Sequence, residues 1–235
     1  VIDTGIDYTH RNYGGPGTVQ AYEVAASSLS SITATITITN PVTGVPVTTT
    51  MFPTDKIPGG YDFVGDTWTG QEADGPLTPD PDPLDPVGPG YDGGHGSHTS
   101  GIVGGFGVPN TSFNGSIPTS NDFDGDVLYH GVAPAVQLYA YKVCSSKANN
   151  CSGIAMIQAM EASADPNGDG DLGDHLDAFN MSIGSSFGGD RVTATAANNA
   201  VLAGVAAAVS AGNSGDVAYI TGAPSIAERA LSVAS

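Results

Sequence analysis

The sequence predicts an α/β fold in which a parallel β-sheet carries helices on both faces. Its 235 residues suit one domain, and 40% of them are hydrophobic, enough for a globular core. A chain of this length buries roughly 70% of the surface that it exposes when unfolded. From residue 95 onward, helix-like and strand-like segments alternate. Such alternation favours parallel strands joined by right-handed crossovers.

The first third is irregular and contains short strands. We expect a buried strand over 1–6 that ends in a glycine turn, a loop over 8–17, and a short strand over 59–66. Within 31–50, Ile alternates with Thr at period two around a Pro and a Gly, which predicts a hairpin; the alternative is a plain surface excursion. The acidic, Pro- and Gly-rich stretch 72–94 predicts a loop, because proline fits neither a helix interior nor a central strand.

The remaining two thirds supply the alternating elements. Small residues indicate a helix over 95–104, and Ser152 is a suitable cap for a helix whose apolar positions recur at helical spacing (Ile154, Ile157, Met160, Ala164). The other expected elements are strands over 136–143, 177–183 and 205–211, a helix over 192–203, and a final strand in 230–235. Functional side chains are expected at the carboxyl ends of the strands.

Charge excludes two classes of partner. The chain has 24 acidic and 6 basic residues, a net charge of −18. So few basic groups argue against binding nucleic acid or anionic lipid. The longest clean apolar run, 200–208, is about half of what a membrane span needs. The acidity favours solubility, cation binding or a salty environment.

Both ends of the sequence look interrupted. Val1 opens directly into an apolar strand, and the last residues form a strand with nothing after it. We therefore expect a fold that is incomplete at both ends, with residues 1–235 forming the N-terminal portion of one domain.

Three polar residues follow predicted strands or precede a predicted helix: Asp3, His95 and Asn213. Each also has an ordinary explanation. Asp3 suits a turn, His95 suits a loop or a metal site, and Asn213 tolerates a left-handed turn. Together they suggest chemistry. A carboxylate that accepts a hydrogen bond from histidine Nδ1 fixes the tautomer whose Nε2 takes a proton from serine. An asparagine amide can stabilise the resulting oxyanion.

The order Asp, His, Asn is the chain order of the subtilisin-like serine proteases, or subtilases. VIDTGID, GHGSHTSGI and VSAGNSG resemble the aspartate, histidine and oxyanion motifs of that family. Further stretches resemble large extracellular subtilases with an inserted protease-associated domain: YDFVGD, DPDPLDP, HGVAPAVQLYAYKVC and DPNGDGD. The resemblance implies a secreted endopeptidase that acts on proteins or peptides, with Asp3 and His95 in the triad and Asn213 as oxyanion donor. It also implies substrate-binding residues, namely Ser182, Ile183, Gly184, Ser185, Ala211 and Gly212.

One departure from the family pattern concerns the nucleophile. The family places its serine in a Gly-Thr-Ser-Met-Ala-x-Pro segment, and no such segment occurs in these residues. We therefore expect the chain as given not to hydrolyse peptides. His98, His10, His130 and His175 are expected to be structural.

Two cysteines, Cys144 and Cys151, lie between a predicted strand and a predicted helix. Such close spacing suits a disulfide in a secreted protein, and the alternative is a pair of free thiols.

The stretch DPNGDGDLGD, residues 165–174, matches part of a calcium loop. Leu176 stands where the bidentate Glu is expected, so Asp174 or Asp177 would have to replace it. The alternative is a solvated acidic turn without metal. The expected structural calcium ligands are Asp165, Asn167, Asp169, Asp171 and Asp174.

The sequence leaves two rival functions. One is a non-catalytic subtilase-like binding module whose serine has been lost. The other is a calcium-dependent adhesion or matrix module, which would leave the order of Asp3, His95 and Asn213 unexplained.

Overall fold

The computed structural model describes residues 1–39, 43–71, 73, 75–109, 127–148, 150–188 and 191–234. Two three-stranded parallel sheets form its centre. The first has the order β1 (Ile2–Asp3), β7 (Tyr139–Lys142), β4 (Gly59–Asp62). The second has the order β10 (Leu231–Val233), β9 (Ala206–Ser210), β8 (Ala178–Met181). The two sheets adjoin because β1 lies beside β8.

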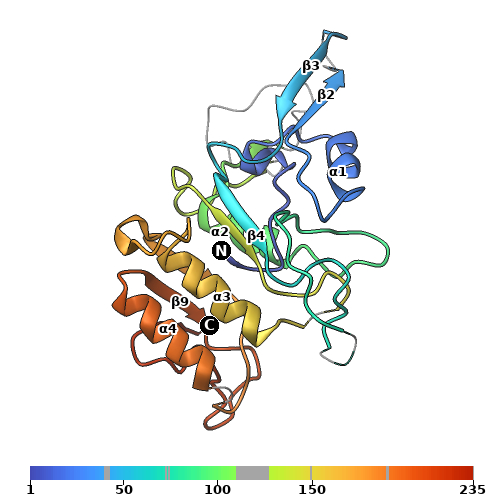
Figure 1. Cartoon of the computed structure of the whole chain (residues 1–235). Coiled ribbons are helices and arrows are strands. Elements are labelled where there is room, and N and C mark those ends of the chain that lie inside the picture. The colour runs from blue at the N-terminus through green and yellow to red at the C-terminus, as the bar shows by residue number, and fades with distance from the viewer. Residues whose placement is uncertain are drawn as a thin grey trace.

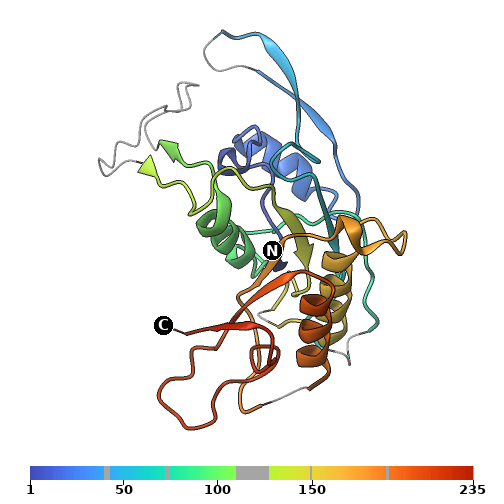
Figure 2. The ribbon, with the colours of Figure 1, turned by 90° about the vertical axis from the view of Figure 1, so that its left-hand side faces the viewer.

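Helices cover both faces of this layer, which confirms the predicted fold class. In Figure 2, α2 (His95–Gly104) lies on one side of the strands, while α3 (Gly153–Ala164) and α4 (Arg191–Leu202) lie on the other. Alternate residues of β7 enter different cores, as the two-residue period of a strand requires. Tyr141 belongs to the core beneath α3 and α4, whereas Ala140 belongs to the core that contains Tyr8 and Met51.

Helix α3 begins as expected and buries most of the expected positions: Met160 and Ala164 lie in the core, and Ile157 packs against it. Ser152 caps it, with its Oγ accepting a hydrogen bond from the Ala155 amide at 3.3 Å. Ile154, expected on the apolar face, is 61% exposed, whereas Ala155 and Ala159 are fully buried. The small alanines allow α3 to pack closely against α4 and the sheet, so the larger residue points outward.

The first third contains the predicted hairpin and one unpredicted helix. Strands β2 (Thr35–Thr39) and β3 (Pro46–Thr50) pair antiparallel and project from the top of the molecule (Figure 1); the turn at 40–42 lies outside the described residues. Helix α1 (Val19–Ala26) has Thr18 as its cap. The shorter elements, of which only the first lies in this third, are η1 (Arg11–Tyr13), the antiparallel pair β5 (Val108–Pro109) and β6 (Val127–Leu128), and η3 (Leu172–Asp174).

The observed strands are shorter than expected, and the first shows why. β1 ends at Asp3 because Gly5 turns the chain with a φ of +114°. A Cβ at Gly5 would lie 2.6 Å from the carbonyl oxygen of Pro83, so the acidic loop packs tightly against this turn. Within the described residues, no helix combines the length and the apolarity that crossing a membrane requires.

Candidate active site

The first two predicted residues meet at the end of β1. Asp3 Oδ1 lies 2.7 Å from His95 Nδ1, although 92 positions separate them in the sequence. The carboxylate is buried and also accepts hydrogen bonds from the Thr4 amide (2.8 Å) and from Thr99 Oγ1 (3.4 Å). The His95 side chain is 51% exposed. A fully buried acceptor therefore holds one ring nitrogen of a histidine that remains open to solvent.

Glycine at position 96 permits this meeting. A Cβ on Gly96 would lie 2.2 Å from the Gly5 carbonyl oxygen and 3.1 Å from Asp3 Cβ. Any other residue would push the first turn of α2 away from β1, and His95 with it. The small residues of the GHGSHTSG segment thus provide close packing between helix and strand.

A cleft of ≈ 660 Å³ joins His95 to most of the other predicted residues. Ser182, Ile183, Gly184 and Ser185, which follow β8, line it together with Gly212 and Asn213, which follow β9. Ala211 is not among the lining residues; its amide donates to the Val233 carbonyl at 2.7 Å and so ties the loop to β10. Asn213 is exposed on this loop, where Gly212 has a φ of +100°.

The predicted cysteine pair is a disulfide. Cys144 and Cys151 are joined with an S–S distance of 2.00 Å, and both line the same cleft. The bridge closes the short loop between β7 and α3, so it constrains one wall of the cleft.

Four more histidines were expected to be structural. His10 caps η1 by accepting from the Asn12 amide, and the Nδ1 atoms of His130 and His175 lie 2.7 Å and 3.0 Å from backbone carbonyl oxygens. His98 lines a separate cavity of ≈ 470 Å³ with His10 and His130. Asp3, the carboxylate paired with His95, does not line that cavity.

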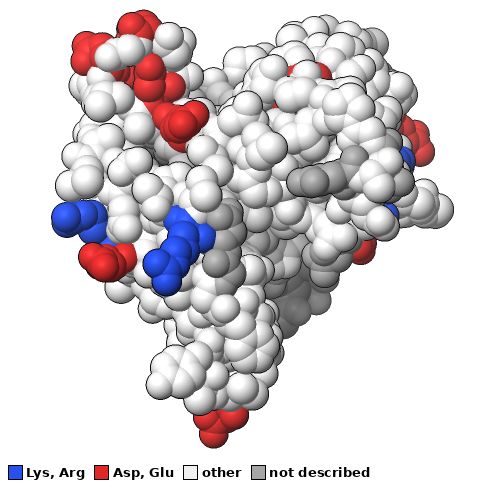
Figure 3. Space-filling view, turned by 60° about the horizontal axis from the view of Figure 1, so that its bottom comes forward, with Lys and Arg blue, Asp and Glu red and all other residues white. Residues whose placement is uncertain are grey.

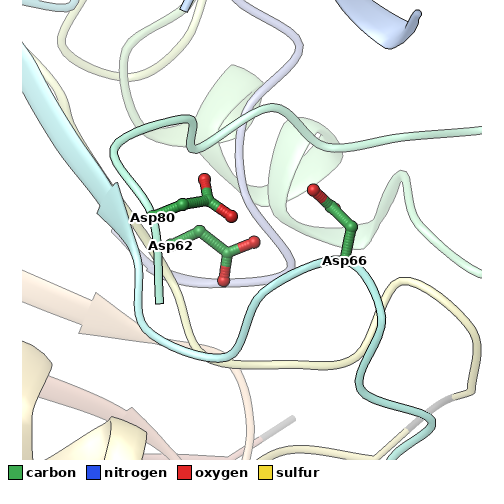
Figure 4. A group of neighbouring side chains, drawn as sticks. All are labelled: Asp62, Asp66 and Asp80. Carbon is green, nitrogen blue, oxygen red and sulfur yellow. The ribbon is translucent and has the colours of Figure 1, made fainter. Parts of the chain in front are cut away.

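A group of carboxylates gathers at the end of β4, separate from the Asp3–His95 pair. Asp62, Asp66 and Asp80 each direct an oxygen toward the others (Figure 4), and these oxygens lie within 4.8 Å of one another. The buried Lys142 ammonium lies 2.7 Å from Asp62 and 2.6 Å from Asp66. Burial alone would lower the pKa of Lys142, but these two carboxylates raise it. The chain's own ammonium therefore supplies the positive charge to this cluster.

Charge compensation is incomplete next to this cluster. Asp82 is fully buried, accepts at Oδ1 from Tyr8 and from the Leu84 amide, and has no partner at Oδ2. Burial, reinforced by the nearby charges of Asp66 and Asp80, raises the pKa of Asp82 to about 7.

In the 165–174 loop, most of the expected calcium ligands accept hydrogen bonds from backbone amides of the same loop. The carboxylate of Asp165 accepts three backbone N–H bonds, from Gly168, Asp169 and Gly170. The side chains of Asn167, Asp169 and Asp171 likewise accept backbone N–H groups within the loop. The loop forms no close acidic group of the kind seen at Asp62. This arrangement is that of an Asx-turn loop.

Sequence reasoning missed the residues that hold α2 in place. Thr4 Oγ1 accepts from the Gly96 amide at 2.7 Å, and Asp85 accepts from the Gly94 and Ser97 amides. A helix that starts with glycine as its cap has no local side chain to satisfy its first amides. A predicted helix with a glycine cap therefore indicates that side chains from elsewhere in the chain accept hydrogen bonds from its first amides.

A buried aspartate that is hydrogen-bonded to a histidine, with an asparagine in the cleft that this histidine lines, is the arrangement expected of a serine peptidase. The family model of the subtilases (Peptidase S8, Subtilase family) matches residues 1–235, and the chain belongs to this family.

Relatives support the assignment. The minor extracellular protease Vpr of Bacillus subtilis is 30% identical over 175 residues, which cover 74% of this chain and 17% of that protein. The subtilisin-like protease SBT3.15 of Arabidopsis thaliana is 35% identical over 127 residues, or 52% of this chain and 15% of that protein. The solved structure of Sphericase has a TM-score of 0.52 and 26% identity, over 75% of this chain and 47% of that one. The chain spans 14% to 18% of the length of the curated relatives that it matches.

Proposed function

We propose that this chain supplies the Asp-His pair, the oxyanion donor and part of the substrate cleft of a secreted serine endopeptidase. One observation carries the proposal: the 2.7 Å contact between Asp3 Oδ1 and His95 Nδ1, where His95 lines a cleft. Family membership supports a serine peptidase as the class. The name of Vpr, an extracellular protease, supports secretion.

In this mechanism His95 is first a base and then an acid. Asp3, held by Thr4 and Thr99, accepts a hydrogen bond from Nδ1–H and so keeps the ring in the tautomer whose Nε2 is free. Nε2 takes the proton of the attacking serine hydroxyl and later delivers it to the leaving amine. Asp3 also stabilises the imidazolium that forms between these two steps.

Asn213 is proposed to stabilise the oxyanion from the loop after β9. Its amide is exposed at the cleft, and Gly212 beside it leaves room for a substrate carbonyl. Replacement of such a donor lowers kcat by roughly 10²–10³-fold in subtilisin. Ser182, Ile183, Gly184 and Ser185 are proposed to contact an extended peptide, whereas Ala211 would act only through the backbone that positions Asn213.

We place the nucleophilic serine outside these 235 residues. Within the described part of the chain, no hydrogen bond joins His95 Nε2 to a serine hydroxyl, although five serines line the cleft: Ser182, Ser185, Ser186, Ser210 and Ser214. None of them stands in the Gly-Thr-Ser-Met-Ala context.

Calcium binding at 165–174 also stays a proposal. Its support is the alternation of oxygen-bearing side chains at 165, 167, 169 and 171. The backbone N–H groups that these side chains accept would pre-order the loop, and they leave lone pairs for an ion, because a carboxylate offers about four acceptor sites.

The test is labelling with a serine-directed fluorophosphonate. The 235-residue chain should not react, whereas the protein that includes the serine segment should react and cleave casein. His95→Ala in that longer protein should lower kcat by several orders of magnitude without unfolding it. Specific labelling of the 235-residue chain would contradict the placement of the nucleophile. A longer protein that is folded but unreactive would favour the non-catalytic binding module.

A further inference from the structure

The buried carboxylate of Asp85 binds the start of the helix that carries His95. Asp85 belongs to the acidic DPDPLDP segment and is fully buried. Its Oδ1 accepts from the Gly94 amide at 2.8 Å, and its Oδ2 accepts from the Ser97 amide at 2.9 Å and the Ser97 hydroxyl at 2.7 Å. Hydrogen bonds to a charged acceptor are roughly twice as strong as those between neutral groups.

These bonds bracket His95. Helix α2 has Gly94 as its cap, so its first amides lack the side-chain acceptor that Ser, Thr, Asp or Asn would provide. Asp85 satisfies the amide just before His95 and the amide two residues after it, and Thr4, adjacent to Asp3, satisfies the Gly96 amide between them. The amides around the histidine are therefore fixed by acceptors from two other segments.

The Asp85 segment is in turn fixed to the Asp3 loop. The Ile6 amide donates to the Pro83 carbonyl at 3.0 Å, and the Asp7 amide donates to Ser97 Oγ at 2.8 Å. At position 93, a Cβ would lie 2.6 Å from Asp85 Oδ1, so no larger residue than glycine fits beside this carboxylate. A displacement of Asp85 would thus change the position of His95 relative to Asp3.

We propose that Asp85 is a positioning residue that holds His95 in register with Asp3. It touches neither the substrate cleft nor the histidine ring, and it acts through the backbone of the first turn of α2. The inference concerns the same Asp3–His95 pair as the proposed function. Its test therefore uses a readout that needs neither a serine nor peptidase activity.

The readout is the Nδ1 proton of His95, observed by NMR in the ¹⁵N-histidine-labelled 235-residue chain and assigned by its loss in His95→Gln. Asp85→Asn keeps the size of the side chain but turns one acceptor into a donor that faces an amide N–H. We expect the Nδ1 proton to exchange with solvent at least about tenfold faster in this variant, or its signal to be lost. Amide exchange in β7 and α3 should not change.

Two further comparisons separate positioning from general destabilisation. The matched control is Asp92→Asn, which changes an exposed aspartate of the same acidic stretch 72–94 and should leave the exchange of the His95 Nδ1 proton unchanged. Ser97→Ala should accelerate its exchange and Ser97→Thr should restore it, which keeps the inference testable if Asp85→Asn does not fold. An unchanged Nδ1 proton in folded Asp85→Asn would overturn the inference and leave the proposed function intact. Absence of the signal in the unmodified chain would overturn both.

Discussion

Replacing Asp82 with asparagine should stabilise the protein at neutral pH. The buried Asp82 carboxyl has one oxygen without a partner, and burial raises its pKa from 3.8 to about 7. Between these two pH values the native state retains a proton that the unfolded chain has released, so the stability falls as the pH rises. At 1.36 kcal/mol per pH unit, the full effect is about 4 kcal/mol above pH 7.

Asparagine removes this cost and keeps the existing bonds. Its carbonyl oxygen can accept from Tyr8 and from the Leu84 amide as Asp82 Oδ1 does now, at 2.9 Å and 3.1 Å. Its NH₂ group takes the place of the unpartnered oxygen, beside a cluster of acidic residues that attracts a donor. We expect Asp82→Asn to gain about 2–4 kcal/mol at pH 8 and close to nothing at pH 4.

The assay is urea unfolding at a series of pH values across this range. The difference between Asp82→Asn and the unmodified chain should grow from acid to neutral pH and then level off. Asp92→Asn, at an exposed position, should show no such growth. A variant that is less stable than the unmodified chain at pH 8, or whose advantage is the same at every pH, would contradict this prediction.

Two other changes test the remaining charged groups. Lys142→Met should destabilise the fold by about 3–5 kcal/mol, and more at pH 8 than at pH 4, because it leaves the buried Asp62 and the partly buried Asp66 without their ammonium partner. Equal stability to the unmodified chain in thermal melts would show that the ion pairs are not needed. If the 165–174 loop binds calcium, a chelator should lower the Tm and Asp169→Ala should abolish that response. A Tm that is unaffected by chelator across millimolar calcium would leave the loop as a solvated turn, and a full response in Asp169→Ala would place the metal elsewhere.

Short sequence patterns were sufficient to predict the helix and the strand that carry the candidate site. Helix α2 spans the predicted residues 95–104, and Asp3 and His95 meet because each stands at the end of its own element. Composition was less informative about packing. The helical spacing in α3 placed Met160 and Ala164 correctly in the core, but Ile154 is exposed, and the closest packing is made by Ala155 and Ala159.

Contacts among three or more distant segments could not be predicted from local pattern. The cluster around Lys142 joins the end of β4, the middle of the acidic loop and the end of β7. A lysine between apolar residues in AYKV was the available sign, since a buried ammonium needs carboxylate partners. The identity of those partners depends on the register of β4 and β7, which places Asp62 opposite Lys142.

The net charge of −18 is distributed between two physical situations. On the surface, acidic side chains gather in places where Lys and Arg are few (Figure 3), and water solvates them. Among the residues that the structure describes, four aspartates are fully or almost fully buried. Three of them have a defined partner: Asp3 binds His95, Asp62 binds Lys142, and Asp85 binds the start of α2. Asp82 alone of the four keeps an oxygen without hydrogen bond or ion pair. Burying a carboxylate is costly unless donors replace water. Asp3 and Asp85 have such donors and hold the candidate site, whereas Asp82 has an oxygen without a partner and is therefore where stability remains to be gained.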